Sequence, residues 1–158
     1  LQIDFSNTSR DGYSKAHEIS AFSLLPLAKG VTPMMKKSGG GSIISMSFIG
    51  SNLAVPHYHV MGPAKASLEA SSRYLARELG PDNIRVNVVS SGAIKTLSSA
   101  GIKDFAELMR VGAEHSAMKR TVTQEEVAHT ALFLASEASS GITGQVIYVD
   151  CGYSIMAN

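Results

Sequence analysis

The sequence predicts an α/β protein with a parallel sheet, and three observations support this prediction. Segments with apolar residues at helical spacing alternate along the chain with three short segments that are apolar and rich in β-branched residues. Glycine and proline residues mark most of the changes between them. The order helix, strand, helix, strand, helix, strand then requires right-handed crossovers between parallel strands. With 158 residues, the chain corresponds to a single domain.

The first expected helix begins at a capping hydroxyl, that of Thr8 or Ser9, and extends to about Met35. Four of its residues make an apolar stripe at helical spacing: Ile19, Phe22, Leu25 and Leu27. Three residues interrupt this stripe: Pro26, Gly30 and Pro33. Because a proline in a helix interior costs about 3 kcal/mol, we expect a kink or an early end near Leu25.

A glycine-rich turn over 36–41 separates this helix from a short buried strand, Ser42–Phe48. A second helix is expected from about His57 to Glu78, ending at Gly80 and Pro81. The next strand, Ile84–Ser90, is β-branched with apolar residues at alternate positions.

The remaining chain opens with a mixed stretch over 91–120 that contains a short helix near Phe105–Arg110. A third long helix is expected over Thr123–Ser136. Glu126 follows Thr123 by three residues, which is the spacing of a capping box. The last expected strand is Val146–Val149.

The composition excludes several classes of protein. Hydrophobic residues make up 44% and charged residues 17%, which argues against intrinsic disorder. The net charge of +1 gives no reason to expect nucleic acid or an anionic membrane as a partner, and the longest apolar runs are too short to span a membrane. Cys151 is the single cysteine, so we expect a soluble cytoplasmic protein without disulfides or a cysteine-based metal site. The chain begins at Leu1 without an initiator methionine, and we expect it to be the C-terminal portion of a longer polypeptide.

Tyr58 and Lys65 follow the first strand, at the edge of a parallel sheet where ligands bind. On one helix, residues seven apart share a face and are separated by about 10.5 Å along the axis. A ligand lying on that face would meet a phenol at one end and an ammonium at the other, and the ammonium would lower the pKa of the phenol. The alternative is that Tyr58 is a half-buried amphipathic residue and Lys65 a solvated one.

The Tyr-x6-Lys motif and its surroundings resemble the enoyl-acyl carrier protein reductases, a divergent branch of the short-chain dehydrogenase/reductase superfamily. Ordinary members of that superfamily carry Tyr-x3-Lys, and here Gly62 occupies the position of their lysine. The matching segments follow in order along nearly the whole chain: Met61–Ala70, Arg85–Asn87, Ser91–Leu97, Gly101–Phe105, Arg120–Thr123 and Gly144–Gly152.

The resemblance implies a Rossmann-like doubly wound parallel sheet, of which this chain forms the C-terminal portion, about three strands with flanking helices. Residues 1–158 would be one partial domain, the catalytic and substrate-binding half. The glycine-rich phosphate loop and adenosine pocket of the family are not found in this sequence. The implied activity is that of an oxidoreductase of fatty-acid biosynthesis. Hydride would pass from NADH to the β-carbon of a trans-2-enoyl thioester on acyl carrier protein, in a homotetramer.

The resemblance also assigns roles to individual residues. Tyr58 would hydrogen-bond the thioester carbonyl oxygen, where negative charge develops in the transition state. Lys65 would bind the nicotinamide ribose hydroxyls. Ile94 and Thr96 match positions beside the nicotinamide and pyrophosphate. Apart from the resemblance, the position of Ser47 next to this site gives two alternatives, a contact with cofactor or substrate and a plain role at the end of a strand.

Residues 97–109 match the mobile substrate-binding loop of the family, in which Phe105 would line the acyl chain or simply pack its helix. Phe48 stands where the family has a second tyrosine, so the ring is kept at the substrate and its hydroxyl is lost. Ala93 replaces a usual proline. Pro63 is a comfortable first-turn residue if the helix begins at Gly62, but Tyr58 then lies outside that helix.

Two other functions are open at this point. One is reduction of another enone or of a ketone, although the Tyr-x6-Lys spacing argues against a ketone. The other is a non-catalytic homologue that acts only as an oligomer subunit. The cluster of Lys95, Lys103 and Arg110 would meet the acidic acyl carrier protein or form a solvated face that Glu107 partly neutralises.

Overall fold

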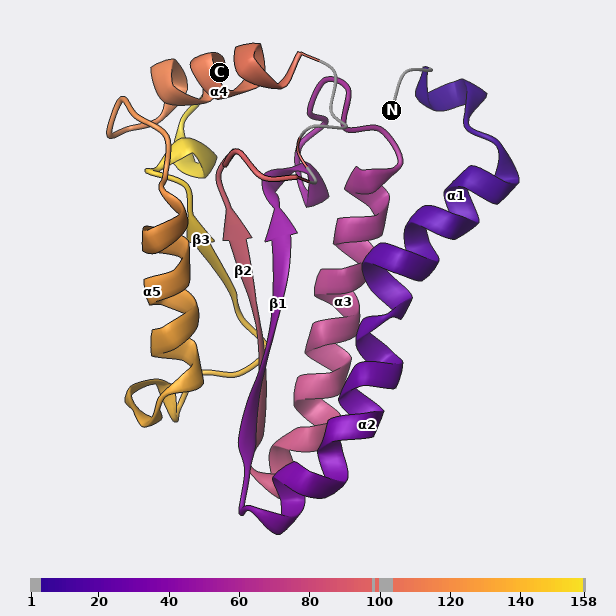
Figure 1. Ribbon diagram of the computed structural model, residues 1–158, viewed down its shortest axis with the longest axis vertical. Helices are drawn as coiled ribbons and strands as arrows, with labels where there is room; N and C mark the ends of the chain where they lie inside the picture. Colours follow the sequence, from indigo (N-terminus) through magenta and orange to yellow (C-terminus); the bar gives the residue numbers. More distant parts are fainter. Residues whose placement is uncertain (1–3, 98, 100–103, 158) are drawn as a thin grey trace.

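The computed structural model describes residues 4–97, 99 and 104–157. Its sheet has three parallel strands in the order β1 (Gly41–Phe48), β2 (Ile84–Ser91) and β3 (Val146–Val149). α3 (Met61–Leu79) and α2 (Leu24–Lys37) cover one face of the sheet, and α5 (Gln124–Ala135) covers the other (Figure 1). The predicted α/β class with a parallel sheet is confirmed, and each strand lies within one residue of its predicted bounds.

The central strand β2 is buried along almost its whole length, because helices cover both faces of the sheet and β1 and β3 pair with its two edges. Val88 and Val89, which point to opposite faces, are 1% and 0% exposed. Asn87 is also buried. Its side-chain amide donates to the Ile142 carbonyl at 2.8 Å, and its side-chain oxygen accepts from the Gln145 N–H at 3.1 Å. The predicted strand is confirmed, and polar residues between its apolar positions, such as Asn87, are buried as well because helices cover both faces of the sheet.

The first helical segment differs from its prediction. It consists of α1 (Arg10–His17), a π-helical turn over Glu18–Phe22, and α2. Ser9 caps α1 by accepting the Gly12 N–H at 3.1 Å. The irregularity thus precedes the expected kink, and Pro26 becomes the third residue of α2. A first-turn proline lacks only an N–H that has no intrahelical partner, so α2 continues past it.

The apolar stripe of this segment faces outward. The exposed fractions of Ile19, Phe22 and Leu27 are 62%, 59% and 67%. The core contact is made instead by Ala21 and Leu24, which pack with Leu68 of α3. The π-helical turn helps to explain the difference, because it rotates later residues relative to regular α-helical spacing.

The C-terminal half follows its prediction closely. α4 (Phe105–His115) is longer than expected and lies beyond the carboxyl ends of the strands (Figure 1). α5 begins with the predicted capping box: the Thr123 hydroxyl accepts the Glu126 N–H at 3.2 Å, and the Glu126 carboxylate accepts the Thr123 N–H at 2.8 Å. In the described residues no helix is long and apolar enough to cross a membrane. The cytoplasmic location stays a prediction.

The carboxylate of this capping box is expected to make the protein sensitive to acid. Arg120 donates to Glu126 at 2.6 Å, and this bond together with the Thr123 N–H lowers the pKa of Glu126 from 4.5 to about 2. A carboxyl whose pKa is lower in the folded state stabilises that state above the unfolded pKa and loses this effect as the pH falls through the folded pKa. We therefore expect the free energy of unfolding to decline from about pH 4.5 towards pH 2.

Denaturant unfolding of the parent chain and of Glu126→Gln across that pH range checks this prediction. The variant should lose part of the dependence on pH, whereas Glu125→Gln, at the exposed neighbouring position, should retain it. Equal pH dependence in the parent and in Glu126→Gln would contradict the role of this carboxylate.

Candidate active site

A cleft of about 530 Å³ opens at the carboxyl ends of β1 and β2, the edge at which open parallel sheets bind ligands. The end of β1, the start of α3, the segment after β2 and the start of α4 all contribute to its walls. The lining residues include Phe48, Tyr58, Met61, Lys65, Ile94, Thr96, Ser99, Phe105 and Leu108. Six of the seven residues predicted for the site thus meet in one cleft, and Ser47 is the exception.

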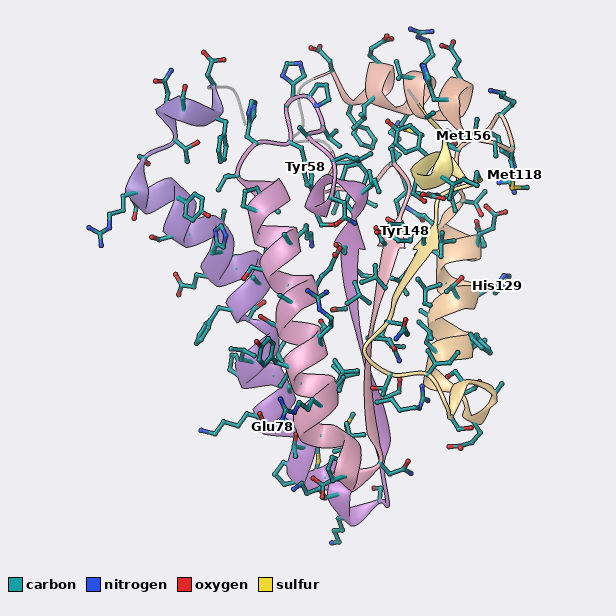
Figure 2. The ribbon with its side chains drawn as sticks, turned by 180° about the vertical axis from the view of Figure 1, so that it is seen from behind. Tyr58, Glu78, Met118, His129, Tyr148 and Met156 are labelled. Carbon is teal, nitrogen blue, oxygen red and sulfur yellow. The ribbon has the colours of Figure 1, made fainter. Side chains whose placement is uncertain are left out.

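Tyr58 lies in a turn before α3, not in the helix (Figure 2). Its N–H donates to the Val55 carbonyl at 3.2 Å. The neighbouring residues His57 and His59 have φ values of 60° and 43°, a left-handed conformation that a right-handed helix excludes. The helix predicted from His57 is therefore wrong at its start, and so is the argument that Tyr58 and Lys65 share a helical face. Pro63 lies in the first turn of α3, as expected for a start near Gly62.

The Tyr58 ring is packed against aromatic and backbone atoms. Only 7% of the residue is exposed, and its ring centroid lies 4.8 Å from that of Phe48. The ring also rests on Gly50, where an added Cβ would come within 2.8 Å of Tyr58 Cε1. Burial raises the pKa of the Tyr58 phenol to about 12. The lowering by Lys65 that the sequence predicted is absent, because loss of hydration disfavours the phenolate.

Lys65 extends from the second turn of α3 into the cleft, where its ammonium donates to the Met46 carbonyl at 2.8 Å. Burial lowers the pKa of Lys65, and the carboxylate of Glu69 partly offsets that effect. An ammonium carries three N–H donors, so the bond to Met46 leaves two for a ligand. The alternative of a fully solvated lysine does not fit this position.

Ser47 has a partner that the sequence did not indicate. It is 4% exposed, does not line the cleft, and donates to the Glu69 carboxylate at 2.5 Å. The predicted contact of Ser47 with cofactor or substrate is not supported by this geometry. The one available sequence signal for Glu69 is its position four residues after Lys65, which places both on one side of a helix.

The segment after β2 forms the wall opposite α3. Ile94 and Thr96 line the cleft as predicted, and the Thr96 N–H donates to the Ser99 hydroxyl at 2.8 Å. Phe105, in the first turn of α4, faces the same space. Sequence reasoning missed Met61, Ser99 and Leu108 as lining residues, since apolar and hydroxyl side chains carry no distinctive motif. Part of the predicted substrate loop, residues 98 and 100–103, lies outside the described residues.

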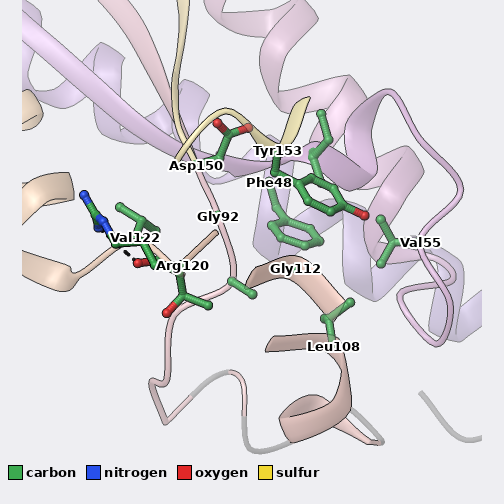
Figure 3. Close-up of a pocket in the computed structure, with 12 residues that line it drawn as sticks. Phe48, Val55, Gly92, Leu108, Gly112, Arg120, Val122, Asp150 and Tyr153 are labelled. Carbon is green, nitrogen blue, oxygen red and sulfur yellow. Dashed lines mark hydrogen bonds between the residues drawn. The ribbon is translucent and has the colours of Figure 1, made fainter. Parts of the chain in front are cut away.

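A smaller cavity of about 30 Å³, whose lining residues Figure 3 draws, shares part of its wall with the cleft. Phe48, Gly92, Ala93 and Leu108 line both spaces. A volume of this size holds about one water molecule. Because Phe48 lies between the two spaces, its ring closes one side of the larger cleft.

Charged residues near the cleft are partly paired. Arg110 donates to Glu107 at 2.6 Å and to Glu114 at 2.5 Å, so the predicted basic cluster is largely neutralised at this residue. Lys103 lies outside the described residues. His57 and Asp104 approach to 3.8 Å, and neither of them lines the cleft. Among the described residues, no group of three or more histidine, cysteine or acidic side chains is placed to hold a metal ion.

The sequence and fold of the chain match one known protein family. The family model described as enoyl-(acyl carrier protein) reductase matches residues 1–154. The chain belongs to the enoyl-(acyl carrier protein) reductase family. The Rossmann-like fold expected from the resemblance is thereby confirmed, since solved structures of this family superpose on the chain with TM-scores of 0.93 to 0.95.

Among curated members of the family, the enoyl-acyl-carrier-protein reductase (NADH) FabI of Nostoc sp. is 54% identical over 156 residues, and that of Bacillus subtilis is 49% identical over 154 residues. These matches cover 99% and 98% of this chain but 60% and 59% of the two relatives. The chain therefore spans about three fifths of the length of these relatives.

Two solved structures of the family include a nucleotide. The Bacillus cereus enoyl-acyl carrier protein reductase with NADP+ and indole naphthyridinone is 47% identical, with a TM-score of 0.94, and the match covers 99% of this chain and 60% of that one. The Anaplasma phagocytophilum reductase in complex with NAD is 39% identical, with a TM-score of 0.93, and the match covers 99% and 59% of the two chains.

Proposed function

We propose that residues 1–158 act as the catalytic and substrate-binding part of an NADH-dependent enoyl-acyl carrier protein reductase of fatty-acid biosynthesis. The observation that carries the proposal is that Tyr58 and Lys65 line one cleft at the carboxyl ends of β1 and β2. Membership of the reductase family and 54% identity to the Nostoc enzyme support it.

The residues of the cleft fit the nicotinamide end of a dinucleotide. Lys65 has two N–H donors beyond its bond to Met46, which suits the vicinal hydroxyls of a ribose. Ile94 offers an apolar surface and Thr96 a hydroxyl on the opposite wall. When bound there, NADH supplies the hydride that the β-carbon of the enoyl thioester accepts.

Tyr58 supplies a hydrogen-bond donor for the thioester oxygen. With its pKa raised to about 12, the phenol keeps its proton at neutral pH. Donation to an oxygen that gains negative charge only during the reaction stabilises the transition state more than the ground state. Packing against Phe48 and Gly50 orients the hydroxyl before substrate binds.

The acyl chain would lie against the apolar wall of the cleft. Phe48 closes one side, and Phe105 and Leu108 of α4 line another. These side chains exclude water from the reacting carbons, and their hydrocarbon surface favours a fatty acyl group over a polar substrate.

The experiment that tests this function follows the absorbance of reduced cofactor when the chain is mixed with NADH and a crotonyl thioester. Substrate-dependent oxidation of NADH supports the proposal. If circular dichroism shows a folded chain and NADH is not oxidised, the reductase function is wrong for this chain and the non-catalytic alternative holds.

We also propose that copies of this chain associate as a homotetramer through the outer surfaces of α2 and α3. Phe22, Leu27 and Met34 on the α2 side and Tyr74 on α3 are large, apolar or aromatic, and 59–76% exposed. An apolar surface of this kind on a folded domain marks an interaction site. The acyl carrier protein that would present the substrate is a separate partner and requires the open mouth of the cleft.

Introducing a charge into this surface is expected to dissociate the assembly. Phe22→Asp would bury an unpaired carboxylate in the contact between subunits, which disfavours association. The sedimentation coefficient of the variant should therefore fall to that of a smaller species. Phe22→Leu keeps the surface apolar and should sediment like the parent chain. A parent chain that sediments as a monomer would overturn the tetramer.

A further inference from the structure

α3 is joined to β1 by polar contacts at three successive strand residues. Ser45 contacts the Ser72 hydroxyl at 3.3 Å, the Met46 carbonyl accepts from Lys65 at 2.8 Å, and Ser47 donates to Glu69 at 2.5 Å. The first of these contacts joins two hydroxyls, and the second joins an ammonium to a backbone carbonyl. The contact of Ser47 differs because it holds a carboxylate inside the protein.

Glu69 is 6% exposed, which is unusual for a carboxylate. A buried charge destabilises the fold unless hydrogen bonds and an opposite charge compensate it. The Ser47 hydroxyl provides the hydrogen bond. Lys65, one helical turn earlier on the same side of α3, carries the opposite charge, and the carboxylate acts on it by raising its pKa.

The sheet presents uncharged polar groups to the same place. Ser47 on β1 is in register with Ser90 on β2, and Ser90 with Tyr148 on β3. The Ser90 hydroxyl is buried without a partner in the described residues, and the Tyr148 hydroxyl accepts from Asn52 at 2.6 Å. Lys65 is thus the cation of this cluster, and Tyr148 is its other titratable group, whose pKa burial and Glu69 both raise.

We propose that Glu69, held in place by Ser47, is a positioning residue for Lys65: its buried carboxylate, one turn further along the same side of α3, favours the charged form of the ammonium that lines the cleft. The assignment deepens the proposed reductase function, on which it rests for its catalytic meaning. Burial lowers the pKa of Lys65, and the carboxylate of Glu69 acts in the opposite direction. Glu69 counteracts that tendency without touching the ligand itself.

The test uses the charge state of Lys65 in the chain without cofactor. Lysines carrying ¹³C at Cε are titrated by NMR in the parent, and Lys65→Arg assigns the Lys65 signal by its disappearance. Glu69→Gln preserves the size of the side chain and an acceptor for Ser47 but removes the charge. The Lys65 titration midpoint should move to lower pH in this variant.

Ser72→Ala is the matched control, because it removes a polar contact between the same helix and strand without changing any charge. It should leave the Lys65 midpoint where it is in the parent. Glu69→Asp retains the charge and should titrate closer to the parent than Glu69→Gln does. It also provides the decisive comparison if the glutamine variant fails to fold. An unchanged midpoint in folded Glu69→Gln, or equal shifts in Glu69→Gln and Ser72→Ala, would overturn the proposal.

Reductase assays distinguish a failure of the role proposed for Glu69 from a failure of the proposed reductase function. If the parent oxidises NADH, the alkaline limb of its pH–rate profile should move to lower pH in Glu69→Gln and stay in place in Ser72→Ala. If the parent has no activity, the reductase function fails, while the NMR titration still decides whether Glu69 sets the charge of Lys65.

Discussion

Replacing Tyr58 by phenylalanine is expected to lower the turnover of an enoyl thioester by about 10²–10³-fold, the usual effect of removing one donor to a developing oxyanion. The substitution keeps the ring that packs 4.8 Å from Phe48 and deletes only the hydroxyl. The free energy of unfolding should therefore change little, while turnover falls. The measurement is the rate of NADH oxidation at saturating crotonyl thioester, with denaturant unfolding of the same preparation.

Tyr13→Phe is the matched control, because it makes the same chemical change on α1 at a tyrosine that is 41% exposed and outside the cleft. Turnover in this variant should equal that of the parent. If Tyr58→Phe also retained full turnover, the phenol would not be the donor to the thioester oxygen. The reaction would then depend on Lys65 and the apolar walls of the cleft.

Local signals predicted the elements of the fold well. The three strands are short apolar segments between turns, and the structure has them where the sequence predicts them. The same holds for Thr123 and Glu126, whose spacing is typical of a capping box. The first helix was predicted less well. A stripe of apolar residues indicates burial only if it faces the core of its own chain, and Ile19, Phe22 and Leu27 face outward instead.

The site was predicted in its membership but not in its geometry. Tyr58 and Lys65 line the same cleft because a turn places the tyrosine there, and not because of helical spacing. In that turn His57 and His59 both have positive φ. Nothing in the types of His57 and His59 requires positive φ. The pKa of Tyr58 was predicted in the wrong direction because burial depends on Phe48 and Gly50, which pack against the ring only in the folded chain. Glu69 was missed for the same reason, since its partner Ser47 is 22 residues away.

Gly62→Ala is expected to destabilise the fold by about 1–3 kcal/mol, the range for overpacking a filled interior. Gly62 is buried in the first turn of α3, and an added Cβ would lie 2.7 Å from the Gly50 carbonyl oxygen. That neighbour is backbone, so it cannot rotate away as a side chain would. The turn that carries Gly50 must shift, and the Tyr58 ring that rests on Gly50 must shift with it.

Denaturant unfolding measures the first effect, and NADH oxidation by the folded fraction measures the second, which should be a loss of turnover. Gly30→Ala serves as the control, because Gly30 lies in the interior of α2 with open space where the Cβ would stand. There the substitution should stabilise the protein by about 0.5–1 kcal/mol through helix propensity alone. If Gly62→Ala lowers the free energy of unfolding and Gly30→Ala raises it, the loss at Gly62 is due to its close approach to Gly50. Stabilisation at both positions would mean that the turn yields freely, and that the position of Tyr58 does not depend on the close approach of these two glycines.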